Sequence, residues 1–310
     1  MIEICNLTKR FGPVTAVDDL SFAVLPGRVT GFLGPNGAGK TTTMLTILGL
    51  ERPDRGDARI AGRRYRDLPV PLREVGSLLD ANSVHGGRRA SDHLRYLAES
   101  NRIPARRIDE VMGMVGLADV ARRRVKGFSL GMRQRLGIAA ALLGDPPVLM
   151  FDEPINGLDP EGILWIRTLM RDLATEGRTV LFSSHLISEV ALAADHLVVI
   201  GKGRLIADTT VQEFIRSGSQ RPVLVRAPRA AELAERLRRA GAEVVVVDDG
   251  AIRVTGMESP AIGDVAAGEG IALHELNTEQ ASLEEAFMEL TRGSVEFHAH
   301  GVGDRAGEGR

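Results

Sequence analysis

The chain has 310 residues, a formal net charge of −2 at pH 7 and a charged fraction of 26%. This length predicts one large domain and a smaller one. Because the net charge is small, no global field attracts nucleic acid, and we expect no nucleic-acid partner. The single cysteine, Cys5, cannot form an intrachain disulfide, and no apolar stretch approaches the roughly 18 residues of a membrane span. We therefore expect a cytoplasmic chain that reaches a membrane only through a partner.

Short strands open the chain. Alternating or continuous apolar residues predict strands at 2–7, 14–17, 20–24 and 29–33. Phe11 lies in the loop after the first of them, where its ring could stack on an adenine base. The alternative for Phe11 is a turn residue packed on the sheet.

A glycine-rich loop follows the strand at 29–33 and leads into an amphipathic helical segment. It fits the pattern G-x-x-x-x-G-K-[ST], which wraps the phosphates of a nucleotide. Glycines let backbone N–H groups point inward, and the helix adds its positive N-terminal end. Lys40 is predicted to reach the β- and γ-phosphates, and the Thr41 hydroxyl suits Mg²⁺. The predicted nucleotide-binding residues of the loop are Gly34, Pro35, Asn36, Gly37, Ala38, Gly39, Lys40, Thr41 and Thr42.

The next part of the chain is predicted to be mainly helical. A short apolar run at 75–79 ends at Asp80. Helices are then predicted over 91–115, with Ser91 as their N-cap and Gly116 as their stop.

A further helix is predicted to begin near Ser129 and to reach about residue 143. Ser129 is placed to cap it, and the small Gly131 leaves backbone N–H groups open to an anion. Serine before a helix is also ordinary capping chemistry, so this pattern by itself does not indicate an anion-binding site.

Two adjacent carboxylates, Asp152 and Glu153, end the continuous apolar run at 148–151. Carboxylates at the end of a buried strand are costly unless a cation meets them. With a phosphate loop upstream, the Mg²⁺ of a bound nucleotide is the expected partner of Asp152, and Glu153 would polarise an attacking water. The alternative is an acidic N-cap for the helix predicted at 160–174.

His185 follows the next predicted strand, at 179–183. A lone histidine is usually a surface or core residue. Here it is expected at the same sheet edge as Lys40 and Asp152, where ligands of α/β sheets bind.

The order of these motifs resembles the ATP-binding cassette (ABC) transporter ATPases across residues 2–215. Such a resemblance implies an α/β fold of the P-loop NTPase class, with antiparallel β and helical subdomains. The chain is most similar to exporter ATPases of the daunorubicin-resistance or ABC-2 type, whose membrane half is a separate polypeptide. The matching pieces are Phe11, the loop at 34–42, the signature-like 128–132 with Gln134 and Arg135, Asp152 with Glu153, the turn at 156–159, and His185.

The resemblance also implies residue roles. Glu153, His185 and Lys40 would be catalytic, with His185 contacting the γ-phosphate. Asp152 would support the Mg²⁺ that Thr41 binds. ATP and Mg²⁺ are thus the expected cofactors.

Dimerisation follows from the resemblance as well. Two cassettes would pair head to tail, so that Ser129 and Gly131 of a second copy close each ATP site in trans. The other expected partner is an integral membrane permease, which would hold the chain at the cytoplasmic face of the membrane.

Two departures from the family pattern stand out. In the signature, Leu130 replaces a glycine and Met132 a glutamine. The second departure is Asp80, where the family usually has glutamine. A carboxylate there could be a Mg²⁺ ligand, a coupling element or a solvated loop residue.

The remainder of the chain is predicted to form a small accessory domain. We expect the cassette at 1–218 and an α+β domain of split-βαβ type at 219–293, with its last helix at 282–291. The final residues, 294–310, are rich in Gly, Arg and Glu and predict a disordered tail.

The function expected from the sequence is therefore ATP hydrolysis that drives export through a separate permease. The alternative is a non-transport ABC ATPase associated with DNA repair or translation. Those proteins usually carry two cassettes or a long coiled coil, and this chain shows neither. An adaptor with an inactive nucleotide site is a further alternative.

Overall fold

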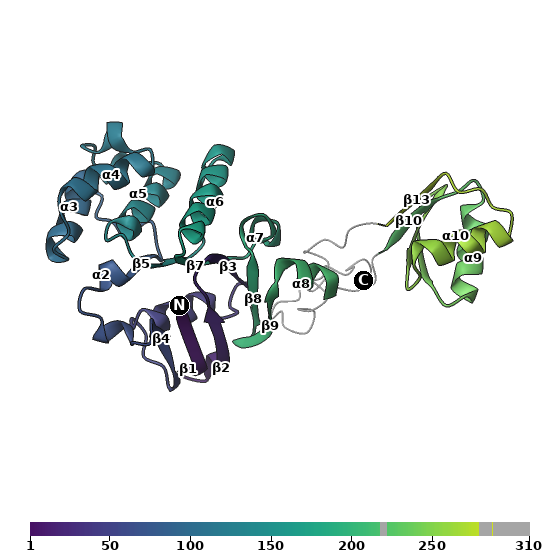
Figure 1. The fold of residues 1–310 in the computed structure, drawn as a ribbon, viewed down its shortest axis with the longest axis horizontal. Helices are drawn as coiled ribbons and strands as arrows, with labels where there is room; N and C mark the ends of the chain where they lie inside the picture. Colours follow the sequence, from purple (N-terminus) through teal and green to yellow (C-terminus); the bar gives the residue numbers. More distant parts are fainter. Residues whose placement is uncertain (218–221, 279–286, 288–310) are drawn as a thin grey trace, which may run out of the picture. The chain divides into compact units, whose positions relative to one another are not determined.

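The computed structural model describes residues 1–217, 222–278 and 287 (Figure 1). They divide into two compact units, the first spanning Met1–Thr210 and the second beginning at Val211. The division falls earlier than the boundary expected after residue 218. Apart from Phe287, the helix expected at 282–291 and the tail expected at 294–310 lie outside the described residues. No helix in the described part of the chain is long and apolar enough to cross a bilayer.

A six-stranded sheet forms the centre of the first unit. Its strands are β3 (Arg28–Leu33), β5 (Val75–Leu78), β6 (Val148–Phe151), β7 (Thr179–Ser184), β8 (His196–Gly201) and β9 (Arg204–Thr210). They run in the order β5-β6-β7-β3-β8-β9, and β8 and β9 form the antiparallel pair in an otherwise parallel sheet. Every residue of β6, β7 and β8 is buried, as expected for strands covered on both faces.

A second, antiparallel sheet of the same unit has the order β2-β1-β4. Its strands are β1 (Ile2–Phe11), β2 (Val14–Val24) and β4 (Arg55–Ile60). The rings of Phe22 in β2 and Phe32 in β3 lie 5.3 Å apart, so the two sheets share one hydrophobic core. We expected two strands within 14–24, but the chain continues as one bent strand through Asp19, whose φ is +52°.

Seven α-helices complete the first unit within the described residues. They are α1 (Lys40–Ile47), α2 (Pro71–Glu74), α3 (Ala90–Ser100), α4 (Arg106–Met114), α5 (Leu130–Leu142), α6 (Pro160–Thr175) and α7 (Ile187–Ala193). The break between α3 and α4 contains Arg102 at φ +53° and Pro104, which cannot continue a helix. The prediction that Ser91 is the N-cap is wrong, because α3 begins at Ala90 and Arg89 holds the N-cap position.

The second unit has the split-βαβ topology that the sequence predicts. It comprises α8 (Val211–Ser217), β10 (Val223–Arg226), α9 (Ala230–Arg239), β11 (Glu243–Asp248), β12 (Ala251–Thr255), α10 (Ser259–Gly268) and β13 (Glu275–Thr278). Its strands pair antiparallel in the order β11-β12-β10-β13. Buried Leu233 and Leu237 of α9 pack with Val225, Ile252 and Ile262 into a separate core.

The close packing of β5 against α5 gives the first prediction. A Cβ at Gly76 would overlap the carbonyl oxygen of Ala141, so Gly76→Ala should lower the free energy of unfolding by about 3 kcal/mol. Gly113→Ala in α4 is the matched control, because no atom lies within 4 Å of its added Cβ. The control should be neutral or stabilising by up to about 1 kcal/mol. Urea unfolding followed by circular dichroism measures both, and equal midpoints would contradict the packing argument.

Candidate active site

The glycine-rich loop connects β3 to α1 with the backbone geometry that its sequence predicts. Gly37 and Gly39 have φ of +82° and +100°, in the left-handed region that glycine favours. A Cβ at Gly34 would lie 2.6 Å from the carbonyl oxygen of Ile200 in β8. Asn36, Gly37 and Thr41 are exposed, so the loop faces solvent.

Lys40 is the first residue of α1, and its side chain folds back over the loop. It is buried, and its Nζ donates hydrogen bonds to the carbonyl oxygens of Gly34 at 2.6 Å and Pro35 at 3.2 Å. Burial lowers the pKa of Lys40, and the carboxylates of Glu153 and Asp152 oppose this shift. A buried ammonium group beside a glycine-rich loop, whose backbone N–H groups can point at an anion, suits a bound polyphosphate.

Asp152 joins three elements at the carboxyl end of β6. The hydroxyl of Thr41, in α1, donates to its Oδ2 at 2.8 Å. The hydroxyl of Ser183, in β7, donates to its Oδ1. Asp152 is thus buried yet has a donor on each carboxylate oxygen. Ser183 did not emerge from the sequence as a site residue, and its only signal was a serine at the end of an apolar strand.

Glu153 turns sharply away from β6 and contacts His185. Its φ of +48° is unusual for a residue with a Cβ. Its backbone N–H donates to Ser183 Oγ at 3.0 Å, and its carbonyl oxygen accepts from Gln134 Nε2 of α5 at 3.1 Å. Its Oε2 lies 2.9 Å from Nδ1 of His185. These bonds fix a strained backbone so that the two side chains meet at the loop's edge of the sheet.

Within the described residues, no hydrogen bond joins Ser129 or Gly131, at the start of α5, to this cluster. Ser129 is the exposed N-cap of α5, and its Oγ accepts from the N–H of Met132 at 3.2 Å. A Cβ at Gly131 would lie 3.0 Å from the carbonyl oxygen of Gly157. Leu130 packs over Gly157 of the same chain, which gives this departure from the family pattern a local packing partner.

Phe11 and Asp80 each have a local partner. Phe11 is the last residue of β1 and is 46% exposed, and the Lys9 ammonium lies 4.9 Å from the centroid of its ring. Asp80 is exposed, and its carboxylate accepts from the N–H of Asn82 at 2.8 Å. Within the described residues, no hydrogen bond links it to Thr41 or Asp152.

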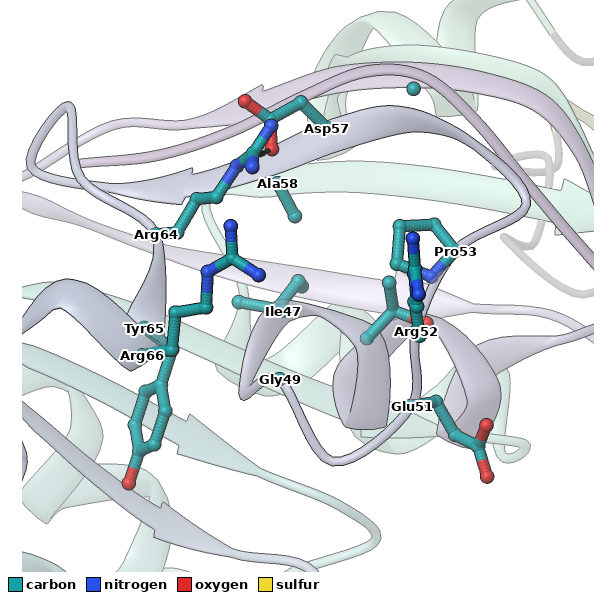
Figure 2. A pocket seen from close by; sticks show the side chains of 12 residues that line it. Ile47, Gly49, Glu51, Arg52, Pro53, Asp57, Ala58, Arg64, Tyr65 and Arg66 are labelled. Atoms are coloured by element: carbon teal, nitrogen blue, oxygen red, sulfur yellow. Dashed lines mark hydrogen bonds and ion pairs between the residues drawn. The ribbon is translucent and has the colours of Figure 1, made fainter.

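A separate hollow of about 370 Å³ lies beside the other end of α1 (Figure 2). Thr46 and Ile47 contribute to its wall, and the side chains of Arg52, Arg64 and Arg66 stand around it. Since the phosphate loop meets the N-terminus of α1, this hollow is not part of the candidate active site.

The cluster of Lys40, Thr41, Asp152, Glu153 and His185 brings together a phosphate loop, a hydroxyl, two carboxylates and an imidazole. Groups of these kinds at one sheet edge can bind an anion, support a metal and accept a proton from water. The fold and this site define an ATPase of the P-loop class.

Comparisons with known proteins specify the family. The family described as "ABC transporter" matches residues 17–156. The uncharacterized ABC transporter ATP-binding protein YhcH of Bacillus subtilis is 36% identical over 97% of this chain and 99% of its own length. The bacitracin transport ATP-binding protein BcrA of Enterococcus faecalis is 33% identical over 94% of this chain and 97% of its own length.

Solved structures agree in fold. The dimeric structure of MJ0796, a bacterial ABC transporter cassette, superposes with a TM-score of 0.62 at 23% identity. The match covers 68% of this chain and 99% of that one.

The relatives at 36% and 33% identity show the family. The chain belongs to the ATP-binding proteins of ABC transporters, and it binds and hydrolyses ATP. Residues 221–284 match a family described as a domain of unknown function (DUF8746).

Ser183 provides a prediction that sequence motifs alone did not. Ser183→Ala removes one donor from Asp152 and the acceptor of the Glu153 N–H, so the ATP turnover number should fall about 10–100-fold. The affinity for ATP measured without metal should change little, because the phosphate loop is untouched. A steady-state phosphate-release assay and a nucleotide-binding titration separate the two quantities.

Thr30→Val is the matched control. Thr30 lies buried on the neighbouring strand β3, and its hydroxyl has no hydrogen-bond partner among the described residues. Its removal should leave turnover unchanged. Equal losses in both variants would show that Ser183 acts only through general packing.

Proposed function

We propose that the chain is the ATP-hydrolysing subunit of an exporter and energises transport through a separately encoded membrane permease. The observation that carries this proposal is the bonded network of Asp152, Glu153 and His185 beside the phosphate loop. The similarity to a bacitracin transport ATP-binding protein along nearly its whole length supports the transport role. The chain would then work peripherally at the cytoplasmic face of the membrane.

Mg²⁺ is the proposed metal of the site. The described residues contain no cluster of three or more His, Cys, Asp or Glu side chains suited to a metal. The donors present are the Thr41 hydroxyl and the Asp152 carboxylate, 2.8 Å apart. Mg²⁺ usually takes one or two protein ligands together with phosphate oxygens and water, so this donor set fits it. Bound there, the metal would neutralise charge on the β- and γ-phosphates.

Glu153 and His185 are the proposed catalytic pair. Glu153 would accept a proton from the attacking water, or hold that water in line with the γ-phosphate. His185 Nδ1 donates to the Glu153 carboxylate at 2.9 Å, which keeps the carboxylate oriented. Lys40 would leave the carbonyl oxygens of its own loop and pair with the nucleotide's phosphates. Phe11, exposed at the end of β1, would stack on the adenine.

A head-to-tail dimer is proposed to complete the site. In one chain Asn36, Gly37 and Thr41 are open to solvent, whereas phosphoryl transfer gains from a closed, dry environment. Ser129 and Gly131 stand at the exposed start of α5 and would present backbone N–H groups to the γ-phosphate of the second copy's ATP. The solved cassette named above is a dimer.

Glu153→Gln tests the proposed chemistry. The amide keeps the shape of the side chain but cannot accept a proton, so turnover should fall about 10²–10⁴-fold. ATP binding should persist. Phosphate release and fluorescent-nucleotide binding, each with and without the co-expressed permease, measure the two effects.

Glu161→Gln, an exposed carboxylate in the first turn of α6, is the control and should behave as the parent chain. Unchanged phosphate release in Glu153→Gln would refute the role of Glu153. Failure of the chain to co-purify with any integral membrane protein from its native host would refute the transport role.

A further inference from the structure

The hollow beside the last turn of α1 has the dimensions of a small-ligand site (Figure 2). Its volume of about 370 Å³ falls within the range that ligand pockets usually have. Its lining comes from three stretches of the first unit, within 46–53, 56–58 and 64–66. These are the end of α1 with the loop after it, the strand β4 and the turn that follows β4.

The two acidic side chains that line the hollow are already paired within the protein. Glu51 Oε2 lies 2.9 Å from Lys9 Nζ of β1. Asp57 pairs with Arg64 at 2.7 Å and with Arg59 at 2.8 Å. These pairs neutralise both carboxylates and hold two sides of the hollow in place. A ligand would therefore meet walls that are already ordered, which lowers the entropic cost of binding.

The positive charge of the hollow, in contrast, is not fully matched. Among the described residues Arg52 has no ion pair, and Arg66 has only the adjacent Asp67, at 3.7 Å with both side chains largely exposed. An exposed pair of this kind is weak. Figure 2 shows the guanidinium groups of Arg66 and Arg64 on one side of the hollow and that of Arg52 on the other. Guanidinium groups bind carboxylates and phosphates through paired hydrogen bonds, so the lining suits an anion.

Apolar groups lie between these arginines. Ile47 and Ala58 line the hollow and are otherwise buried, and Pro53 adds the face of its ring (Figure 2). A hydrated inorganic anion has no use for such a surface, whereas a ring or a short hydrocarbon does. The lining therefore combines an apolar surface with a cationic rim, which is the pattern that a ligand with one apolar and one anionic part requires.

We propose that this hollow binds a small organic anion. The apolar body of the ligand lies on Ile47 and Ala58, and its carboxylate or phosphate group pairs with Arg52 and Arg66. This site goes beyond the proposed function, because the nucleotide loop meets the other end of α1. That helix has eight residues, which separates its two ends by about 12 Å.

Equilibrium dialysis of the full-length chain against 2-naphthyl phosphate tests the proposal. Saturating ADP is present throughout, so that the nucleotide site is already filled. The parent chain should bind one equivalent of 2-naphthyl phosphate saturably. Inorganic phosphate alone and 2-naphthol alone should each bind at least about 10-fold more weakly, because each lacks half of the chemistry that the hollow recognises.

Substitutions locate the bound probe. Arg52→Gln and Arg66→Gln should each weaken binding of 2-naphthyl phosphate about 10-fold, since each removes a charged donor. Arg63→Gln is the matched control, because Arg63 is exposed on the same turn but does not line the hollow. The control should bind as the parent chain does, and thermal melting of each variant checks that all are folded.

Three results would overturn the inference. The first is the absence of saturable binding when ADP is present. The second is equal affinity in Arg52→Gln, Arg66→Gln and Arg63→Gln. The third is that 2-naphthol or inorganic phosphate binds as tightly as 2-naphthyl phosphate, which would reduce the hollow to an apolar or a cationic surface patch.

Discussion

The buried carboxylate of Asp152 is the interaction on which the active site depends. It accepts hydrogen bonds from Thr41 and Ser183, and so ties the phosphate-loop helix and β7 to the end of β6. An unpartnered carboxylate at this depth would be strongly destabilising, and both donors come from neighbouring elements. The hydrogen bonds that satisfy this one negative charge therefore also align the phosphate loop, the end of β6 and the end of β7, which His185 follows.

Glu153, the residue after Asp152, is the proposed catalytic carboxylate, and its position depends on the same alignment. Glu153 leaves β6 at a positive φ, which turns its side chain towards His185, while Ser183 and Gln134 hold its N–H and carbonyl groups. Gln134 belongs to α5, the helix that begins at Ser129. A displacement of α5 is therefore coupled directly to the carboxylate proposed to act on water. Among the described residues, the bond from Gln134 to the Glu153 carbonyl oxygen is the hydrogen bond that joins α5 to this carboxylate's backbone.

Much of this arrangement could be predicted from the sequence, because its strongest signals are local. The loop at 34–42 follows a buried strand and precedes a helix, and Asp152 and Glu153 come directly after β6, as predicted. Features that depend on distant neighbours could not be predicted. The role of Ser183 arises from its register beside Asp152. Ser91 is not the N-cap of α3, because this helix already begins at Ala90. The Asp80 carboxylate accepts a hydrogen bond from the N–H of Asn82 in a local turn. Its role as a Mg²⁺ ligand stays a prediction.

The central claim is that one chain carries half of a catalytic site and that two chains hydrolyse ATP together. The most direct measurement is the rate of phosphate release as a function of chain concentration. The account predicts that the rate rises with the square of chain concentration before it becomes linear. A rate that is strictly proportional to chain concentration, down to the lowest measurable amount, would contradict it.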